Sequence, residues 1–294
     1  MYKITGIRNN IMHNVVNFVD DSTNLIAFKE NRHIKRYLDN YFELLHSYYS
    51  INKLKINPDK THFLICASKI IQINLKNLTL QAKNYVIKQS NVIKILGSYI
   101  RKDLKLDTEI GNIASNLHYK INQLRNIQHL TNFNTRLAFL NATIIGKLNY
   151  LLPLYLHGTK ENILKLHKII MASARLAIGH YGCKLNITKI LDKCKWLKIE
   201  SMMVMASLKF IHKITLSQKP KVIANKFKNI KNKRKVCELI PLYIPRLKIF
   251  KKFYLIKATK IYNKLPQHFK TMSKNMFKKS IKTWIKSAVW DTYD

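Results

Sequence analysis

The chain has 294 residues, a length that suits one large domain or two modest ones. Apolar residues make up 47% of it and charged residues 23%, ordinary values for a folded protein that exclude wholesale disorder. The charge is unusual, because 53 Lys and Arg stand against 15 Asp and Glu and leave a formal net charge of +38. This excess predicts a polyanionic partner, of which nucleic acid is the default. Codon bias toward Lys, Asn and Ile is an alternative source for part of it.

Cysteine usage and hydropathy restrict the cellular setting. The 4 Cys are too few and too scattered for a disulfide scaffold. No apolar run approaches the roughly 18 residues of a membrane span, and Met1 is not followed by the apolar core of a signal peptide. We therefore expect a reduced, intracellular protein of the nucleus or cytoplasm, with no transmembrane segment and no membrane partner.

The first hundred residues predict short strands and one helix. Residues 14–28 form an apolar, turn, apolar pattern that is typical of two strands around a tight turn. Residues 34–48 carry apolar side chains at spacings of three and four, which indicates an amphipathic helix. Further strands are expected at residues 62–66, 70–75 and 92–100.

Beyond residue 108 the apolar pattern changes to the helical period. Four apolar stripes with spacings of three and four predict four helices. These stripes begin at Ile110, Leu137, Ile163 and Met202. The sequence therefore predicts an α+β protein in three parts, which are a mixed block over residues 1–105, a helical region over 106–195 and a basic helical region over 196–294.

Basic residues concentrate toward the C-terminus. Residues 201–290 hold 23 Lys or Arg and a single acidic residue, Glu238. The densest basic cluster consists of Lys231, Lys233, Arg234 and Lys235. Three interpretations of this cluster stay open: a patch that contacts nucleic-acid phosphates, a nuclear-import signal, and a solvated loop.

Asp20 and Asp21 lie at the tip of the first predicted hairpin. Two adjacent carboxylates repel each other and need a compensating cation, and hard oxygen ligands suit Mg²⁺. A pair of such ions about 3.5–4 Å apart can hold the attacking and leaving oxygens of a phosphoryl transfer. The alternative interpretation is that Asp-Asp-Ser-Thr is simply a favourable turn sequence.

Three sequence elements occur in an order that resembles a known family. Residues 17–23 (Asn-Phe-Val-Asp-Asp-Ser-Thr) resemble the signature hairpin of reverse transcriptases. Residues 54–61 (Leu-Lys-Ile-Asn-Pro-Asp-Lys-Thr) resemble the segment that follows the next helix, and residues 94–97 (Lys-Ile-Leu-Gly) resemble a later hairpin. The resemblance is closest to reverse transcriptases of non-LTR (LINE-type, Jockey-like) retrotransposons. It covers residues 14–100 in detail and the rest of the chain loosely.

The resemblance implies a partial polymerase palm, built of antiparallel hairpins and a helix, followed by a thumb-like helical region and a basic C-terminal region. It implies that Asp20 and Asp21 are catalytic ligands of Mg²⁺, that Phe18 lies near the primer terminus, and that Lys60 donates a proton to departing pyrophosphate. Leu96-Gly97 would be the primer grip, where a glycine lets the backbone approach nucleic acid closely. The implied activity is RNA-directed DNA polymerisation (nucleotidyl transfer), with an RNA template and a DNA primer, or a duplex, as partners.

The chain departs from the family upstream of the hairpin. Reverse transcriptases need a third carboxylate on an earlier strand, and the nineteen residues before Asp20 contain no Asp or Glu. The fingers and the nucleotide-binding segment are also absent from this sequence. We therefore expect a C-terminal fragment, from a truncated element copy or an incomplete gene model, that does not polymerise alone.

Two other functions stay open. The chain resembles group II intron maturases in its Asp-Asp hairpin, and intron sequence around the gene would favour that assignment. It can instead be a non-catalytic nucleic-acid-binding protein that retains the aspartates as a relic. A zinc site at His180, Cys183 and Cys194 lacks a fourth ligand, so buried structural cysteines are expected there.

Overall fold

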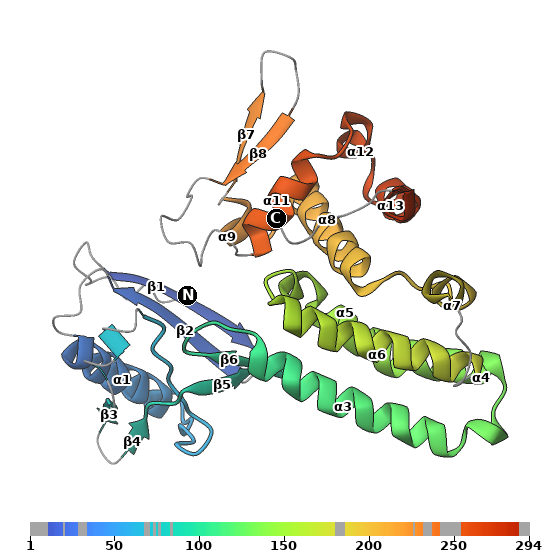
Figure 1. Cartoon of the computed structure of the whole chain (residues 1–294). Coiled ribbons are helices and arrows are strands. Elements are labelled where there is room, and N and C mark those ends of the chain that lie inside the picture. The colour runs from blue at the N-terminus through green and yellow to red at the C-terminus, as the bar shows by residue number, and fades with distance from the viewer. Residues whose placement is uncertain are drawn as a thin grey trace. The chain divides into compact units, whose positions relative to one another are not determined.

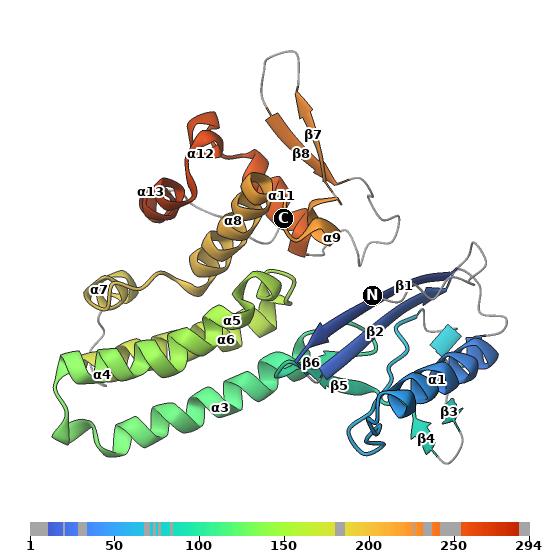
Figure 2. The ribbon, with the colours of Figure 1, turned by 180° about the vertical axis from the view of Figure 1, so that it is seen from behind.

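The computed structural model describes residues 11–19, 21–28, 34–67, 71–72, 75, 78–82, 85–179, 186–225, 227–231, 237–241 and 254–287. The chain divides into two compact units, Met1–Lys105 and Leu106–Asp294. Figures 1 and 2 show the elements of both units from opposite sides. The structure mixes helices with short antiparallel strand pairs, which confirms the predicted α+β class.

The described part of the first unit contains three hairpins and one long helix. Its elements are β1 (Ile11–Phe18), β2 (Asp21–Phe28), α1 (Ile34–Ile51), β3 (Thr79–Ala82), β4 (Tyr85–Lys88), β5 (Val92–Ile95) and β6 (Ser98–Arg101). The strands pair antiparallel in sequence order, β1 with β2, β3 with β4 and β5 with β6. The predicted first hairpin, the predicted helix and a pairing within residues 92–100 are thereby confirmed.

Two of the expected strands differ from the structure. Residues 62–66 form no strand, and Phe63 makes only an isolated parallel bridge to Gln89. Within the expected strand at residues 70–75, Ile71 and Gln72 are helical. Both predictions were wrong because a short apolar run does not by itself distinguish a strand from a helix or an irregular segment.

Helix α1 joins the hairpins of the first unit. Phe42 packs with Leu80 and Ile87 in a small core, and the Asp39 carboxylate accepts a hydrogen bond from the backbone N–H of Gln81 in β3 at 3.1 Å. Tyr41 reaches the other hairpin, where its hydroxyl donates to Asn24 Oδ1 at 2.8 Å. The helix therefore contacts the β1–β2 hairpin through Tyr41 and the β3–β4 hairpin through Asp39 and Phe42.

The second unit is mostly helical. Its helices are α3 (Asp107–Asn126), η1 (Gln128–Leu130), α4 (Phe133–Leu140), the π-helical turn η2 (Asn141–Ile145), α5 (Gly146–Tyr155), α6 (Lys160–Ile178), α7 (Ile187–Lys193), α8 (Ile199–Ser217), α9 (Lys221–Ala224), α11 (Tyr254–Asn263), α12 (Gln267–Thr271) and α13 (Lys274–Ser287). The strands β7 (Phe227–Lys231) and β8 (Cys237–Pro241) form one antiparallel pair. Each of the four predicted apolar stripes lies on a helix.

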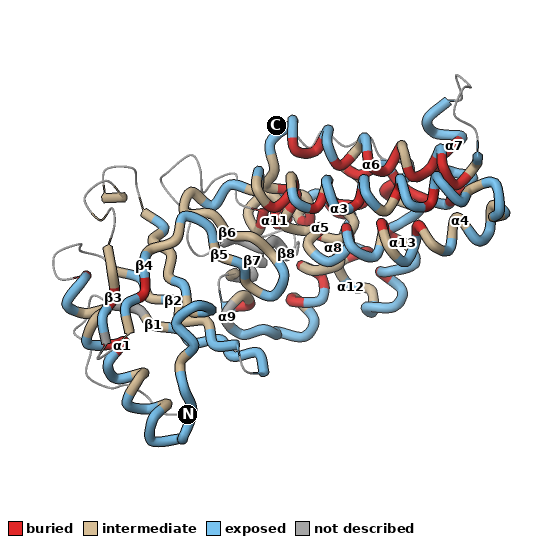
Figure 3. The backbone as a smooth tube through the Cα atoms, turned by 90° about the horizontal axis from the view of Figure 1, so that it is seen from below, coloured by how far each residue is buried: buried red, intermediate tan, exposed pale blue. Residues whose placement is uncertain are grey.

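A single hydrophobic core occupies the second unit. It runs from Ile110 in α3 to Ile285 in α13, so residues on both sides of position 195 share it. Figure 3 shows buried residues recurring along α3, α5 and α6, with exposed residues between them. Helix α6 is central, because it contacts α3, α4, α7 and α8, and its Leu166 is completely buried.

One apolar segment among the described residues, Phe133–Tyr155, has the length and composition of a membrane span. It comprises α4, η2 and α5. Leu140, Ile144 and Leu148, spaced by four residues, are completely buried in the core of the second unit. Only 22% of its most apolar stretch is buried, and a core helix of a folded unit meets the same length and composition criteria, so the segment is weak evidence for a span.

His212 links α8 to the C-terminal helices. A carbonyl can only accept, so Nε2 of His212 donates to the carbonyl of Met272 at 3.0 Å. A neutral imidazole has one donor and one acceptor nitrogen, so Nδ1 accepts from the Tyr262 hydroxyl at 3.0 Å. The ring stacks on Phe277 with centroids 3.9 Å apart. Burial lowers the pKa of His212, although the bond to the Met272 carbonyl acts in the opposite direction. A buried neutral imidazole thus joins α8, α11 and α13.

Replacement of Leu166 by Ala is expected to lower the free energy of unfolding by about 2–5 kcal/mol, because it leaves a cavity in the core. Leu164→Ala on the same helix is the control, since Leu164 is 52% exposed and its loss should change stability by less than about 0.5 kcal/mol. Urea unfolding of both variants measures the difference. Equal losses would contradict the assigned core face of α6.

Acid is expected to destabilise the second unit through His212. Because its folded pKa is lowered, the unfolded chain binds a proton that the folded chain does not, and stability is lost as the pH falls below about 6.5. Thermal unfolding between pH 7.5 and pH 5.5 should show a smaller pH dependence in His212→Asn than in the parent. His118→Asn, at an exposed position, should keep the parent's dependence. A pH dependence that is the same in all three proteins would refute this role.

Candidate functional site

The turn of the first hairpin has an unusual backbone. The register of β1 and β2 ends with Phe18 opposite Asp21, and Val19 lies in the turn directly after β1. Val19 has a φ of 55° and is 90% exposed. Hairpin turns favour Asn or Gly at positive φ, and a β-branched residue there is strained. Turn propensity therefore does not account for Val19, which argues against the interpretation of this segment as a favourable turn sequence alone.

Asp21 is exposed at the start of β2. No hydrogen bond or ion pair from the described residues reaches its carboxylate, so that carboxylate is accessible to a cation. Ser22 Oγ donates to Asn17 Oδ1 at 2.9 Å and links the two strands next to Asp21. Phe18, 59% exposed, lies opposite Asp21 on β1. Asp20 lies outside the described residues, and no group of three His, Cys, Asp or Glu able to hold a metal occurs among those that are described.

Aromatic contacts hold the hairpin against α1. The ring of Tyr41 meets His13 edge-on with centroids 4.7 Å apart, and Tyr37 meets Phe28 in the same way at 5.3 Å. Burial raises the pKa of Tyr41 to about 12, so its hydroxyl stays protonated and donates to Asn24. The hairpin that carries Asp21 is therefore anchored along its length while its tip stays exposed.

Lys60 lies in a compact turn. The side chain of Asn57 accepts from the backbone N–H of Asp59 at 3.0 Å and of Lys60 at 3.3 Å, and Thr61 Oγ1 donates to the Asn57 carbonyl at 2.7 Å. These hydrogen bonds form an Asx turn, and this turn accounts for the Asn-Pro-Asp-Lys-Thr sequence without a catalytic role. The turn exposes Lys60, and no contact among the described residues joins it to Asp21.

Leu96 and Gly97 form the turn between β5 and β6. Both have positive φ, 47° and 84°, which is the pattern of a type I′ hairpin turn. A Cβ built on Gly97 meets nothing within 4 Å. The glycine is therefore explained by its backbone conformation, and the expected close approach of another molecule is not needed to account for it.

The structure describes one residue of the basic cluster, Lys231. Lys231 ends β7 and pairs with Cys237. Lys233, Arg234 and Lys235 lie outside the described residues.

The zinc alternative involves one described residue. Cys194 is buried, and burial raises its thiol pKa to about 11, as expected of a structural cysteine. His180 and Cys183 lie outside the described residues.

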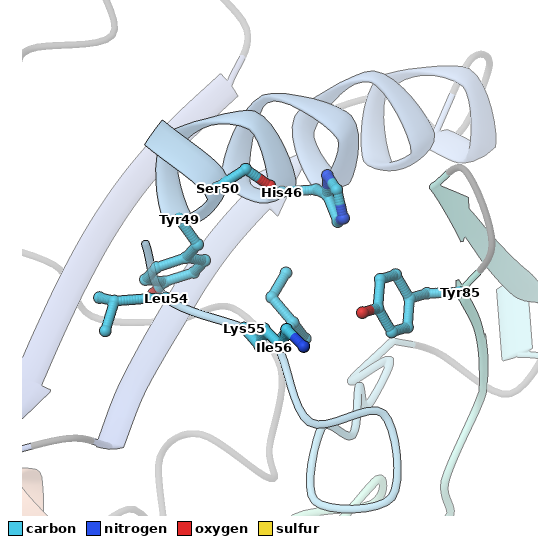
Figure 4. Close-up of a pocket in the computed structure, with 7 residues that line it drawn as sticks. All are labelled: His46, Tyr49, Ser50, Leu54, Lys55, Ile56 and Tyr85. Carbon is cyan, nitrogen blue, oxygen red and sulfur yellow. The ribbon is translucent and has the colours of Figure 1, made fainter. Parts of the chain in front are cut away.

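A pocket of about 220 Å³ lies between α1, the segment after it and β4. Figure 4 shows Tyr49 and Leu54 on one side of it, Tyr85 on the other, His46 above, and Lys55 and Ile56 below. Nδ1 of His46 is buried and has no hydrogen-bond partner among the described residues. Leu54, Lys55 and Ile56 belong to the segment 54–61 that was singled out from the sequence, but none of the proposed site residues lines this pocket, so sequence analysis did not predict it.

Comparison of the chain with models of protein families, with curated proteins and with solved structures gives no match. The site must therefore be judged by its residues. Of the two aspartates expected from the sequence to bind a metal, the structure describes Asp21, at the exposed end of the first hairpin.

Ala at position 97 is expected to destabilise the first unit by about 1 kcal/mol, because an L-residue with a Cβ disfavours the left-handed conformation even where there is open space. Gly111→Ala is a matched control with the opposite sign. Gly111 lies within α3 and also has open space around a built Cβ. Its replacement by Ala should raise the free energy of unfolding by about 0.5–1 kcal/mol. Hydrogen exchange of the two units measures both changes. A neutral Gly97→Ala would argue against the type I′ turn.

Proposed function

We propose that the chain is the C-terminal part of an RNA-directed DNA polymerase of the non-LTR retrotransposon type, with a partial palm in its first unit. The observation that carries this proposal is the β1–β2 hairpin, in which the strained, exposed Val19 precedes Asp21, whose carboxylate has no hydrogen bond or ion pair from the described residues. Strain of this kind persists at sites where function requires it. The order of hairpin, amphipathic helix, Asn-Pro-Asp-Lys-Thr turn and Leu-Gly hairpin adds support.

In this proposal Asp20 and Asp21 hold Mg²⁺ through their carboxylate oxygens, and the ion would supply Lewis-acid activation of the primer hydroxyl and the nucleotide phosphates. Phe18, exposed opposite Asp21, is available to contact the primer terminus. Lys60 is the proposed proton donor to departing pyrophosphate. The second unit, as a thumb-like region with a basic C-terminal extension, would bind the template–primer duplex.

A second candidate is a nucleic-acid-binding protein without catalysis. The formal charge of +38 favours it independently of the hairpin, because phosphate neutralisation needs cations and no metal site. It differs from the first candidate in one respect that can be measured: binding should persist unchanged when the two aspartates are replaced.

Metal binding at the hairpin is tested by iron-directed cleavage. Fe²⁺ in place of Mg²⁺, with ascorbate and peroxide, produces radicals that cut the backbone beside the bound ion. We expect cuts close to residues 17–24 that excess Mg²⁺ suppresses and that Asp20→Asn/Asp21→Asn abolishes. Glu43→Gln, which removes an exposed carboxylate from α1, is the matched control and should keep the cuts. Cuts that survive the double replacement would refute the metal site.

The same preparation, given an RNA template, a DNA primer, nucleotides and Mg²⁺ or Mn²⁺, should show no primer extension. Residues 1–19 contribute no carboxylate, so the proposed two-metal site in a purified chain of these 294 residues lacks a ligand. Extension that disappears in Asp20→Asn would contradict the expected inactivity while supporting the proposed family.

A further inference from the structure

Helix α13 separates its apolar and basic residues onto different faces. Phe277, Ile281 and Ile285 are at most 2% exposed and belong to the core of the second unit. Four lysines recur at every fourth position on the solvent side, and all four are exposed; this lysine row consists of Lys274, Lys278, Lys282 and Lys286. The helix contains no acidic residue. A spacing of four residues corresponds to a rise of about 6 Å per lysine, so the row extends over about 18 Å.

Helix α8 packs against α13 and adds a fifth lysine. Lys209 is half-buried, and its pKa is lowered by burial and by the positive charges of Lys278 and Lys282. These three ammonium groups are therefore close enough to repel one another. None of the ion pairs in the described part of the chain neutralises them. The repulsion is a cost that an anionic ligand would relieve.

The C-terminal end of the lysine row contacts the segment between α7 and α8. Lys286 forms an ion pair with Asp192 at 2.8 Å, and Lys282 Nζ donates to the carbonyl of Lys195 at 3.4 Å. These contacts anchor α13 beside the segment that connects α7 and α8. Lys286 is therefore the paired member of the row among the described contacts, and the charges of Lys209, Lys274, Lys278 and Lys282 lie uncompensated by an ion pair from the described residues on two packed helices.

The shape of the row selects the ligand. A single phosphate would occupy one or two lysines, whereas a row about 18 Å long matches about five consecutive phosphates of one strand at 3.4 Å of axial rise each. A membrane surface fits less well, because an amphipathic helix binds lipid by burying its apolar face, and this face is already in the protein core.

We propose that the lysine row, together with Lys209, binds the sugar–phosphate backbone of duplex nucleic acid without reading its sequence. The inference rests on the proposed function only for the class of ligand, and it requires neither a metal ion nor polymerisation. The other basic cluster, at positions 231–235, is separate in sequence and is not needed for it.

The test is binding of a fluorescent 20-base-pair DNA duplex, and of an RNA–DNA hybrid of unrelated sequence, in EDTA over a range of KCl concentrations. The triple variant Lys209→Gln/Lys278→Gln/Lys282→Gln should bind both at least about tenfold more weakly. It should also lower the slope of log affinity against log salt by about 2–3, since each phosphate contact contributes about 0.9. Two duplexes of different sequence should bind the parent equally.

The matched control removes the same charge elsewhere in the second unit. Lys147→Gln/Lys168→Gln/Lys189→Gln changes three exposed lysines on α5, α6 and α7. If both triple variants lose affinity and salt slope equally, net charge alone explains binding and the proposal is overturned. It is also overturned if the row variant keeps duplex affinity but loses binding to phosphatidylserine vesicles, since the surface would then be a lipid site.

Lysine acetylation of the parent protein keeps the proposal testable if the variant fails to fold. Bound duplex should protect Lys278 and Lys282 from an acetylating reagent while leaving Lys168 and Lys189 reactive. Equal protection of all four would overturn the assignment. Because these measurements contain EDTA, failure of iron-directed cleavage at the hairpin would not affect them, and loss of the row would not affect that cleavage.

Discussion

Burial of the apolar stripe on α6 is the interaction on which the second unit depends. The helix contacts α3, α4, α7 and α8, and its buried residues connect the first helices of the unit to the last ones. Each fully buried Leu or Ile contributes about 1.5–3 kcal/mol through the hydrophobic effect. In a chain with a net charge of +38, this burial must also overcome charge repulsion, which favours expansion.

The same burial arranges the charges. When Phe277, Ile281 and Ile285 enter the core, the helical period turns the lysines at 278 and 282 outward and toward Lys209 of α8. A sequence with diffuse positive charge thereby acquires a linear array of cations. The proposed contact with nucleic-acid backbone follows from this geometry, and the metal chemistry proposed for the hairpin does not enter into it.

In the first unit, α1 is the helix that other elements pack against, as α6 is in the second unit. Its Tyr41 and Asp39 hold two hairpins, and the exposed tip beyond Tyr41 carries Asp21. The first hairpin, α1 and the turn at Leu96-Gly97 were predictable because strong local patterns and turn chemistry specify them. The strands expected at residues 62–66 and 70–75 were wrong, because apolar runs this short do not distinguish a strand from a helix or an irregular segment. The pocket beside His46 depends on contacts between segments distant in sequence.

The sequence by itself determined the α+β class, the helical stripes, the excess of positive charge and the Asp-Asp hairpin, because each follows from local periodicity, composition or turn chemistry. Only the tertiary structure decided that Val19 is strained, that Gly97 serves a type I′ turn, that His212 joins three helices, and that Lys209 lies beside Lys278 and Lys282. The backbone angles at Val19 and Gly97 are set by the register of their hairpins. The contacts of His212 and Lys209 depend on which helix faces pack together, and that is fixed by long-range burial, which a pattern within one segment does not specify.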